Sequence, residues 1–183
     1  SPKDLCTIGF LDQVLDSGTN ILKIEGRGRS PEYVKTTTQS YREAADAYLE
    51  GTYNKEKVKG WINKLESVYN RGFWDGYYLG QKLGEWTRIH GSKATKKKIY
   101  LGKAKNYFAK IQVAEFDLET QHLKEGDNIL ITGRTTGIIE TVAGEIRLND
   151  KQVESVRKGD NFSMRVDHIV RPSDKLYKIE NIK

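Results

Sequence analysis

The chain has 183 residues, enough for one or two small domains, and 31% of them are charged. No apolar run is long enough to cross a bilayer, which argues against a membrane-spanning protein, and residues 1–4 do not resemble the start of a signal peptide. One cysteine excludes an internal disulfide framework, so we expect a cytoplasmic protein. Because the chain does not begin with Met, we expect it to be part of a longer protein.

The first 51 residues predict a helix, a strand and a second helix. Apolar residues at helical spacing indicate a helix from Asp4 to Leu15. Asn20–Ile24 is too short for a helix and is typical of a buried strand. Ser30 is a suitable N-cap with Pro31 at the first helical position, and Gly51 ends this helix. The alternation is part of an α/β pattern.

Residues 52–94 predict a helical connector. A second amphipathic helix is expected from Asn54 to Tyr69. Residues 70–80 contain aromatic side chains interrupted by glycines and predict a packed loop. These aromatic side chains either pack in a core or stack on a ligand. Residues 90–93 are the expected linker to the rest of the chain.

The tail after residue 95 shows strand signals at regular spacing, typical of a small closed β-barrel. Asn149-Asp150 is a natural two-residue hairpin turn. Two similar polar turns, residues 124–127 and 157–160, each precede an apolar strand. The expected strands are Ile99–Tyr107, Ala109–Phe116, Asn128–Thr132, Thr136–Thr141, Glu145–Leu148, Gln152–Val156, Asn161–Val166 and Tyr177–Glu180.

Positive charge is concentrated where the two parts meet. The formal net charge is +6, and from Lys82 to Lys110 nine basic residues accompany one acid, Glu85. That segment carries +8, so the remainder sums to −2. It either attracts a polyanion such as RNA or forms a solvated linker.

Lysines interleaved with aromatic residues are the ingredients of single-stranded RNA binding, with lysine on phosphate and aromatic rings on bases. The alternative is that the rings, including Tyr100 and Phe108, point into the barrel core. The candidate RNA-binding residues are Lys96, Lys97, Lys98, Lys103, Lys105, Tyr107 and Lys110.

A charged segment follows the first expected strand. Glu25, Arg27 and Arg29 lie between that strand and the next helix, where α/β enzymes place their chemistry. Glu25 is the candidate catalytic residue, as a proton acceptor or by orienting an arginine, and the two arginines are candidate substrate ligands. The alternative is a structural ion pair at a strand end.

The chain resembles the C-terminal part of the collagenase-like peptidase family, number thirty-two of the unknown-mechanism class. The segments that carry the resemblance are Asp4–Cys6, Leu22–Arg27, Ser30–Val34, Asn70–Gly76 and Lys98–Gly102.

This resemblance implies an α+β fold in three parts. Residues 1–51 would be the last helix, strand and helix of an incomplete TIM-like barrel, whose upstream part is a partner of this chain. Residues 52–94 would be the helical connector, and residues 95–183 a β-barrel similar to the second domain of translation elongation factors. A lone barrel strand leaves its backbone groups unpaired. Ile21–Ile24 should therefore pair with another chain, pair with the tail, or not be a strand.

Several members of the family are RNA base hydroxylases, which use prephenate and an iron–sulfur cluster and act on transfer or ribosomal RNA. Arg27 and Arg29 would then suit a dicarboxylate such as prephenate. Position 29 often carries Lys in the family, which has different geometry. Cys6 falls on a metal-ligand cysteine of the family. The intact protein would thus hold an iron–sulfur cluster or zinc, and this chain alone would hold neither because the partner ligands lie upstream.

The expected function is therefore part of an RNA base hydroxylase, inactive as this chain alone, with the β-barrel aiding RNA binding. The alternatives are the peptide-binding tail of a genuine peptidase and a non-catalytic interaction module like those of translation factors. Protease chemistry finds little support, since His90, His122 and His168 lie in the linker or tail and form no metal-binding pair.

Overall fold

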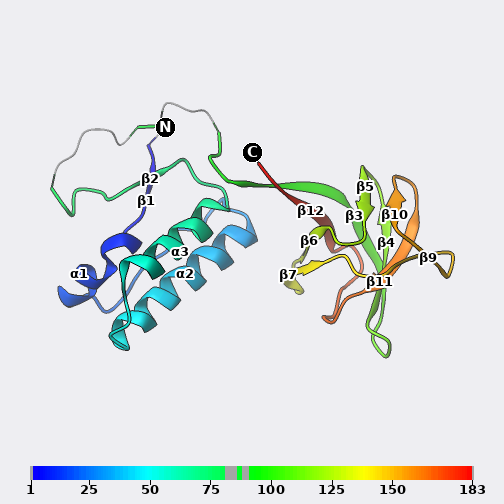
Figure 1. The fold of residues 1–183 in the computed structure, drawn as a ribbon, viewed down its shortest axis with the longest axis horizontal. Coiled ribbons are helices and arrows are strands. Elements are labelled where there is room, and N and C mark those ends of the chain that lie inside the picture. The colour runs from blue at the N-terminus through cyan, green and yellow to red at the C-terminus, as the bar shows by residue number, and fades with distance from the viewer. Residues whose placement is uncertain (1, 81–85, 88–90, 183) are drawn as a thin grey trace. The chain divides into compact units, whose positions relative to one another are not determined.

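The structure is a computed structural model that describes residues 2–80, 86–87 and 91–182. The chain divides into two compact units that meet between Thr95 and Lys96 (Figure 1). We call residues 2–95 the helical unit and residues 96–182 the sheet unit. No helix in the described residues is long and apolar enough to span a membrane. The elements of the first two predicted parts pack together in the helical unit.

The helical unit is built on two packed helices. Its elements are β1 (Asp4–Leu5), the 3-10 helix η1 (Ile8–Phe10), α1 (Leu11–Asp16), α2 (Pro31–Leu49), α3 (Lys55–Glu66) and β2 (Phe73–Trp74). Its core lies between η1, α1, α2 and α3, and the fully or nearly buried side chains are Ile8, Leu11, Ala44, Ala47, Trp61 and Leu65.

Local signals explain where the two long helices begin and end. Ser30 is extended and Pro31 opens α2 as predicted, although the Ser30 side chain makes no capping hydrogen bond. Gly51 has φ +67°, a conformation that suits glycine, and it follows the end of α2. Asn54 caps α3 by accepting hydrogen bonds from two backbone N–H groups. The helix ends at Glu66, earlier than expected.

The predicted helix from Asp4 to Leu15 is wrong in its first half. Asp4–Leu5 is instead a strand that pairs in parallel with Phe73–Trp74, within the segment expected to be a loop. The Asp4 N–H donates to the Gly72 carbonyl at 2.8 Å, and the Cys6 N–H donates to the Trp74 carbonyl at 2.9 Å. These contacts, distant in sequence, override the helical periodicity, so the helix begins only at Leu11.

The predicted strand Asn20–Ile24 is absent. The segment has no regular secondary structure, and Ile21 is 86% exposed. Of the three outcomes expected for it, the third is found: the segment is not a strand here. No described strand pairs with it.

The sheet unit is an eight-stranded antiparallel sheet with a separate two-stranded pair, β5 with β10. The order of the large sheet is β7-β6-β12-β3-β4-β11-β8-β9. The strands are β3 (Lys96–Phe108), β4 (Val113–Leu118), β5 (His122–Lys124), β6 (Asn128–Gly133), β7 (Gly137–Val142), β8 (Ile146–Leu148), β9 (Lys151–Val153), β10 (Ser155–Arg157), β11 (Asn161–Arg165) and β12 (Lys175–Asn181).

The predicted all-β tail is found, with different boundaries and an open edge. Among the described strands β7 pairs only with β6 and β9 only with β8, so backbone hydrogen bonds do not close the sheet into a barrel. The expected strand Gln152–Val156 is two strands, and the three-residue strand β5 was not predicted. The hairpin turn at Asn149-Asp150 is confirmed, with φ of 51° and 62°.

One turn recurs three times in the sheet unit, at residues 124–127, 157–160 and 171–174. In each copy the Asp at the fourth position accepts the backbone N–H of the first residue at 2.8 Å through its side chain. The third residue has a positive φ: Gly126 at 88°, Gly159 at 97° and Ser173 at 72°. The third copy escaped notice in the sequence because Pro172 and Ser173 replace the residues of the other two.

Each turn is joined to a distant residue by two backbone hydrogen bonds. The third residue of the turn donates to the carbonyl of that residue, whose own N–H donates to the carbonyl of the turn's Asp. The three distant residues are Ala143, Leu118 and Ala104. The turns therefore fix the register at which three strands begin. The core of the sheet unit includes the buried side chains Leu101, Phe116, Leu123, Ile131, Phe162 and Leu176.

Candidate functional site

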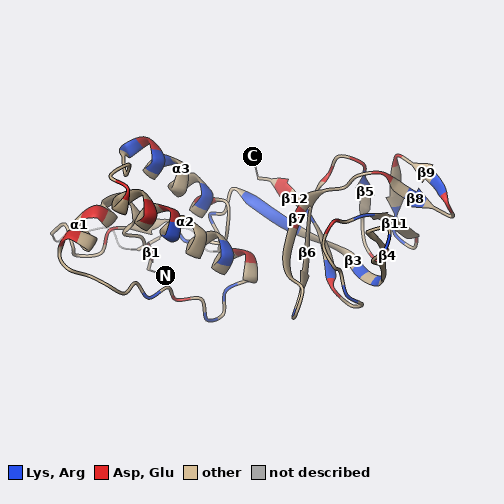
Figure 2. Cartoon of the chain, turned by 90° about the horizontal axis from the view of Figure 1, so that it is seen from below, with Lys and Arg blue, Asp and Glu red and all other residues tan. Residues whose placement is uncertain are grey.

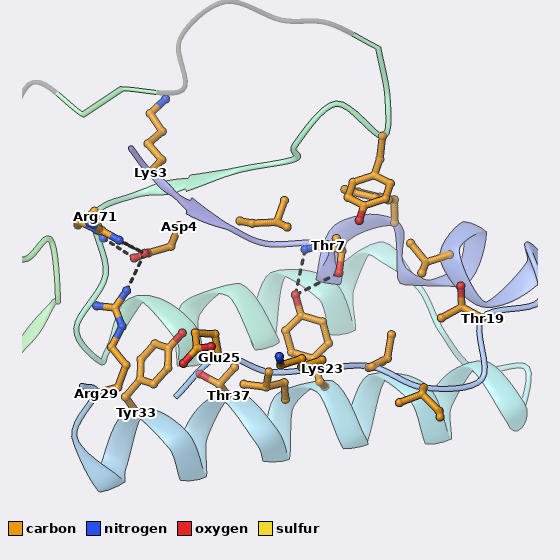
Figure 3. A pocket seen from close by; sticks show the side chains of 18 of the residues that line it. Lys3, Asp4, Thr7, Thr19, Lys23, Glu25, Arg29, Tyr33, Thr37 and Arg71 are labelled. Atoms are coloured by element: carbon orange, nitrogen blue, oxygen red, sulfur yellow. Dashed lines mark hydrogen bonds and ion pairs between the residues drawn. The ribbon is translucent and has the colours of Figure 1, made fainter. Parts of the chain in front are cut away.

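A large groove opens in the helical unit, with a volume of about 1380 Å³ (Figure 3). Its lining comes from β1, the irregular segment 19–30, the first turns of α2 and the loops around residues 69–71 and 78–79. The predicted site residues Glu25, Arg27 and Arg29 all lie in this lining.

Arg29 is held in an ion-pair cluster around Asp4. Its Nη2 lies 2.8 Å from Asp4 Oδ1, and Arg71 Nη2 lies 3.1 Å from the same oxygen (Figure 3). The Arg29 guanidinium also lies over two aromatic rings, 5.0 Å from the centroid of Tyr33 and 4.8 Å from that of Tyr69. The structural ion pair that the sequence left as an alternative is thus formed at Arg29.

Three other cationic side chains line the groove and form no ion pair with a carboxylate of the described residues. Arg27, Lys23 and Lys3 have no ion-pair partner within the described part of the chain. Glu25 accepts the backbone N–H of Arg27 at 2.7 Å, so its carboxylate fixes the turn of the backbone there. The unpaired side chains give the groove a positive electrostatic potential that favours an anionic ligand.

Lys3 and Lys23 were not among the site residues predicted from the sequence. Lys23, Glu25 and Arg27 alternate along an extended segment and are all exposed, while the residues between them are half-buried. This two-residue period was the available signal, since it puts the three side chains on one side of the segment.

Part of the lining is apolar and consists of Leu5, Phe10, Tyr78 and Leu79. Tyr78 is 66% exposed, and its ring lies 6.1 Å from the centroid of the buried Phe10 ring. Gly76 has φ +66°, and a Cβ there would lie 2.9 Å from Leu5 Cδ1 and 3.1 Å from Tyr78 Cδ2. Glycine at position 76 therefore lets the loop place Tyr78 beside β1.

A buried hydroxyl also lines the groove. Thr37, on α2, is 7% exposed, and its Oγ1 has no hydrogen-bond partner among the described residues. In Figure 3 it lies near Glu25 and Tyr33. An unsatisfied buried hydroxyl costs about 1–3 kcal/mol, which a ligand with polar atoms can recover.

Cys6 lies beside the groove in a small hydrogen-bonded cluster. The Tyr41 hydroxyl accepts the Thr7 N–H at 2.9 Å and donates to Cys6 Sγ at 3.9 Å. Burial raises the pKa of the Cys6 thiol, opposed in part by hydrogen bonds from Ile8 and Tyr41, and burial raises the pKa of Tyr41 to about 12. Both groups are therefore protonated at neutral pH.

The described residues do not supply a metal site. They contain no group of three His, Cys, Asp or Glu side chains close enough to hold an ion. Cys6 can offer one ligand, whereas zinc and iron–sulfur sites need about four. His122 and His168 are exposed in the sheet unit, and His90 lies outside the described residues.

The predicted RNA-binding lysines of β3 and its hairpin are all exposed. Three are paired with acids: Lys97 with Glu180 of β12 at 3.1 Å, Lys105 with Glu115 of β4 at 3.5 Å, and Lys103 with Glu119, which follows β4, at 3.0 Å. These acids offset much of the charge that is concentrated in the sequence. Basic residues still mark the start of β3 (Figure 2), and Lys98 Nζ lies 4.7 Å from the Tyr177 ring centroid.

Tyr107 was expected on a surface that binds RNA, but its ring lies elsewhere. Its hydroxyl donates to the Val166 carbonyl at 3.0 Å, and its ring packs against the core of the sheet unit. The following residue, Phe108, is 46% exposed. Alternation along the strand puts the two rings on opposite faces, and the core alternative left open by the sequence applies to Tyr107.

The fold and the groove define a two-unit α+β protein with a cationic groove beside a half-buried cysteine. Residues 1–88 match the model of peptidase family U32. The chain belongs to peptidase family U32, in agreement with the resemblance of its motifs.

The chain is similar to proteins whose names describe two different activities. It is 52% identical over 180 residues to a collagenase of Porphyromonas gingivalis, covering 98% of this chain and 44% of the relative. It is 32% identical over 155 residues to tRNA hydroxylation protein P1 of Bacillus subtilis, covering 79% of this chain and 35% of the relative. The chain thus spans half or less of the length of these relatives.

A solved structure is also similar: the C-terminal domain of a Geobacillus thermoleovorans protein described as a U32 peptidase. The TM-score is 0.42 at 19% sequence identity, and the match covers 45% of this chain and 93% of that domain.

Proposed function

We propose that the intact protein takes part in RNA base hydroxylation, with this chain supplying part of the substrate groove and additional RNA contacts. The observation that carries the proposal is the set of unpaired cations, Lys3, Lys23 and Arg27, in the groove of the helical unit. Its support from relatives is the 32% identity to a tRNA hydroxylation protein over 79% of this chain. RNA offers the anionic groups that such a groove favours.

Within the groove the predicted residues take separate roles. Arg27 binds the anionic group of a substrate through two parallel N–H donors of its guanidinium, which no carboxylate of the described residues occupies. Glu25 orients the Arg27 backbone through its 2.7 Å hydrogen bond. Arg29 acts as a positioning residue that ties segment 25–29 to Asp4.

The metal centre belongs to this proposal for the intact protein only. Cys6 would be one ligand of an iron–sulfur cluster or zinc, and the others would come from residues outside this chain. The raised pKa of Cys6 means that binding a metal here releases a proton. The described residues alone do not fit the group.

Mass spectrometry of RNA tests the proposal. Cells that lack the full-length protein are compared with cells that carry it, or carry Arg27→Ala or the control Lys59→Ala. Lys59 is exposed on α3 and does not line the groove. We expect a hydroxylated nucleoside to disappear without the protein, to fall at least fivefold with Arg27→Ala and to return with Lys59→Ala. Unchanged RNA hydroxylation without the protein would sink the proposal.

Peptide hydrolysis is the second candidate, favoured by the 52% identity to a collagenase over 98% of this chain. It is tested with the intact protein on collagen and on gelatin. Cleavage that survives Arg27→Ala, together with unchanged RNA in cells lacking the protein, would favour the peptidase. RNA changes without cleavage would favour the hydroxylase.

A further inference from the structure

The groove of the helical unit has two walls of different chemistry. We call the unpaired cations Lys23 and Arg27 of its lining the cationic wall, and the exposed ring of Tyr78 the aromatic wall. We infer that this groove receives a single unpaired nucleotide, with its base stacked on Tyr78 and its phosphate bound by Lys23 and Arg27. The inference rests on the proposed action on RNA, and it specifies what part of the RNA enters.

The aromatic wall is suited to a base. Tyr78 is 66% exposed although it lies in the lining, and the buried Phe10 supports its ring at 6.1 Å. Gly76 allows the close approach of this loop to Leu5. A ring that is held by its neighbours and still open to solvent is a stacking platform, and every base has a π-face to offer it.

The cationic wall is suited to a phosphate. Lys23 and Arg27 have no acidic partner in the described ranges, and Lys3 adds a third such cation. Two acids also line the groove: Asp4 is bound by Arg29 and Arg71, and Glu25 accepts the Arg27 backbone N–H and keeps its negative charge. The cations of the lining outnumber these acids by five to two. The groove therefore keeps a net attraction for an anion.

The two walls together favour a nucleotide over other occupants. A nucleoside uses only the aromatic wall, and inorganic phosphate uses only the cations. A nucleotide uses both, and its sugar and base also bring polar atoms to the buried, unpartnered hydroxyl of Thr37. The volume of about 1380 Å³ is ample, since sites for drug-sized ligands have roughly 300–1,000 Å³.

Calorimetric titration of the 183-residue chain tests the inference. The probes are the four ribonucleoside 5′-monophosphates, the matching nucleosides and inorganic phosphate. We expect at least one monophosphate to bind about tenfold more tightly than its nucleoside and than phosphate. Tyr78→Ala should weaken monophosphate binding about tenfold and leave phosphate binding unchanged, and Tyr78→Phe should restore it because the ring remains.

Matched controls separate the groove from its surroundings. Tyr77 is 57% exposed on the same loop and does not line the groove, so Tyr77→Ala should bind like the wild type. Arg27→Ala and Lys23→Ala should each weaken both monophosphate and phosphate binding about fivefold, whereas Lys59→Ala should not. Circular dichroism of each variant confirms that the fold is kept.

Three outcomes would overturn the inference: equal affinity for monophosphates and nucleosides, equal losses for Tyr77→Ala and Tyr78→Ala, or an acidic peptide that displaces the nucleotide at lower concentration. The cellular RNA measurement is independent of these titrations. Lost RNA hydroxylation with no nucleotide binding would remove the inference and leave the proposed function. Nucleotide binding with unchanged cellular RNA would do the reverse.

Discussion

At the scale of single residues, Asp4 has the largest structural role in the groove. Its carboxylate accepts hydrogen bonds from Arg29, from the Arg71 side chain and from the Arg71 backbone. Asp4→Asn would leave two half-buried guanidinium groups without a counter-charge. We expect a loss of about 2 kcal/mol, less than for a fully buried pair because Arg71 is 30% exposed.

Denaturation followed by tryptophan fluorescence measures this loss, because all three Trp residues precede residue 96 and report on the helical unit. The matched control is Asp46→Asn, which breaks the exposed pair between Arg42 and Asp46. The control should cost under about 0.5 kcal/mol. Equal losses in the two variants would show that the Asp4 cluster contributes no more than a surface ion pair.

Cys6 provides a prediction that depends on pH. Burial raises the pKa of its thiol, so at a given pH the folded chain holds less thiolate than the unfolded chain. Only the thiolate reacts with iodoacetamide, and we expect several-fold slower alkylation of the folded chain at pH 8. The rate should climb toward the unfolded rate only above the ordinary thiol pKa. A folded chain that reacts as fast as the chain in urea contradicts the burial.

The raised pKa of the Cys6 thiol also determines how the stability of the fold changes with pH. Because the folded state keeps its proton to higher pH than the unfolded state, this thiol's contribution to stability is fully present below the unfolded pKa. It is lost as pH rises through the folded pKa. Cys6→Ser, with a hydroxyl that does not titrate in this range, should remove that part of the alkaline loss.

At the residue scale, a local cause brings the predicted site residues together. Glu25, Arg27 and Arg29 line one groove because they follow one another in a short segment, and their roles stay predictions. Their partners could not be foreseen, because Arg29 is bound by Asp4, and Asp4 is positioned by Arg71 from a distant loop. The sequence contains no local signal for contacts of that separation.

At the scale of elements, the three recurring turns make a prediction about backbone strain. Ser173 has φ +72°, where its two counterparts are the glycines 126 and 159. Its side chain is exposed and has no partner that the structure describes. Ser173→Gly should therefore raise the free energy of unfolding of the sheet unit by about 0.5–1 kcal/mol.

The reciprocal variant Gly159→Ser should lower the free energy of unfolding of the sheet unit by a similar amount. Far-UV circular dichroism under urea follows both, because the sheet unit contains no tryptophan. A destabilising Ser173→Gly would mean that entropy of the unfolded chain outweighs the strain of the turn.

Helix α2 and strand β1 show what could be predicted at this scale. Pro31 and Gly51 lie at the ends of α2 and are local signals, so the helix was found with nearly correct bounds. The pairing of β1 with β2 depends on two segments of two residues each, far apart in the chain. Apolar periodicity around Leu5 therefore suggested a helix where a distant strand decides the structure.

The proposed RNA contacts of the sheet unit can be tested at the hairpin after β3 and at the start of β3. Lys96 and Lys110 are exposed without a described acidic partner, whereas Lys103 and Lys105 are paired with acids. Replacing the first two by Ala should reduce the slope of log affinity against log salt by about one to two for single-stranded RNA. The double variant of Lys103 and Lys105 should change it less. Equal changes would show that the ion pairs do not restrain these lysines.

At the scale of the whole molecule, the two units have separate cores. The buried side chains of the sheet unit form one cluster, those of η1, α1, α2 and α3 form another, and the two clusters share no residue. We therefore predict that residues 96–183 fold alone. The isolated fragment should give a dispersed NMR spectrum whose amide signals overlay those of the full chain, except near Lys96.

In the full chain, tryptophan fluorescence and the signals of the sheet unit should then lose their native values at different urea concentrations, because two independent cores need not unfold together. The helical unit should unfold first, since its core has six buried residues against seventeen in the sheet unit and its groove leaves apolar side chains in water. Ser173→Gly should shift only the second transition and Asp4→Asn only the first. Coincident transitions that both variants shift would show that the two units stabilise each other and fold as one.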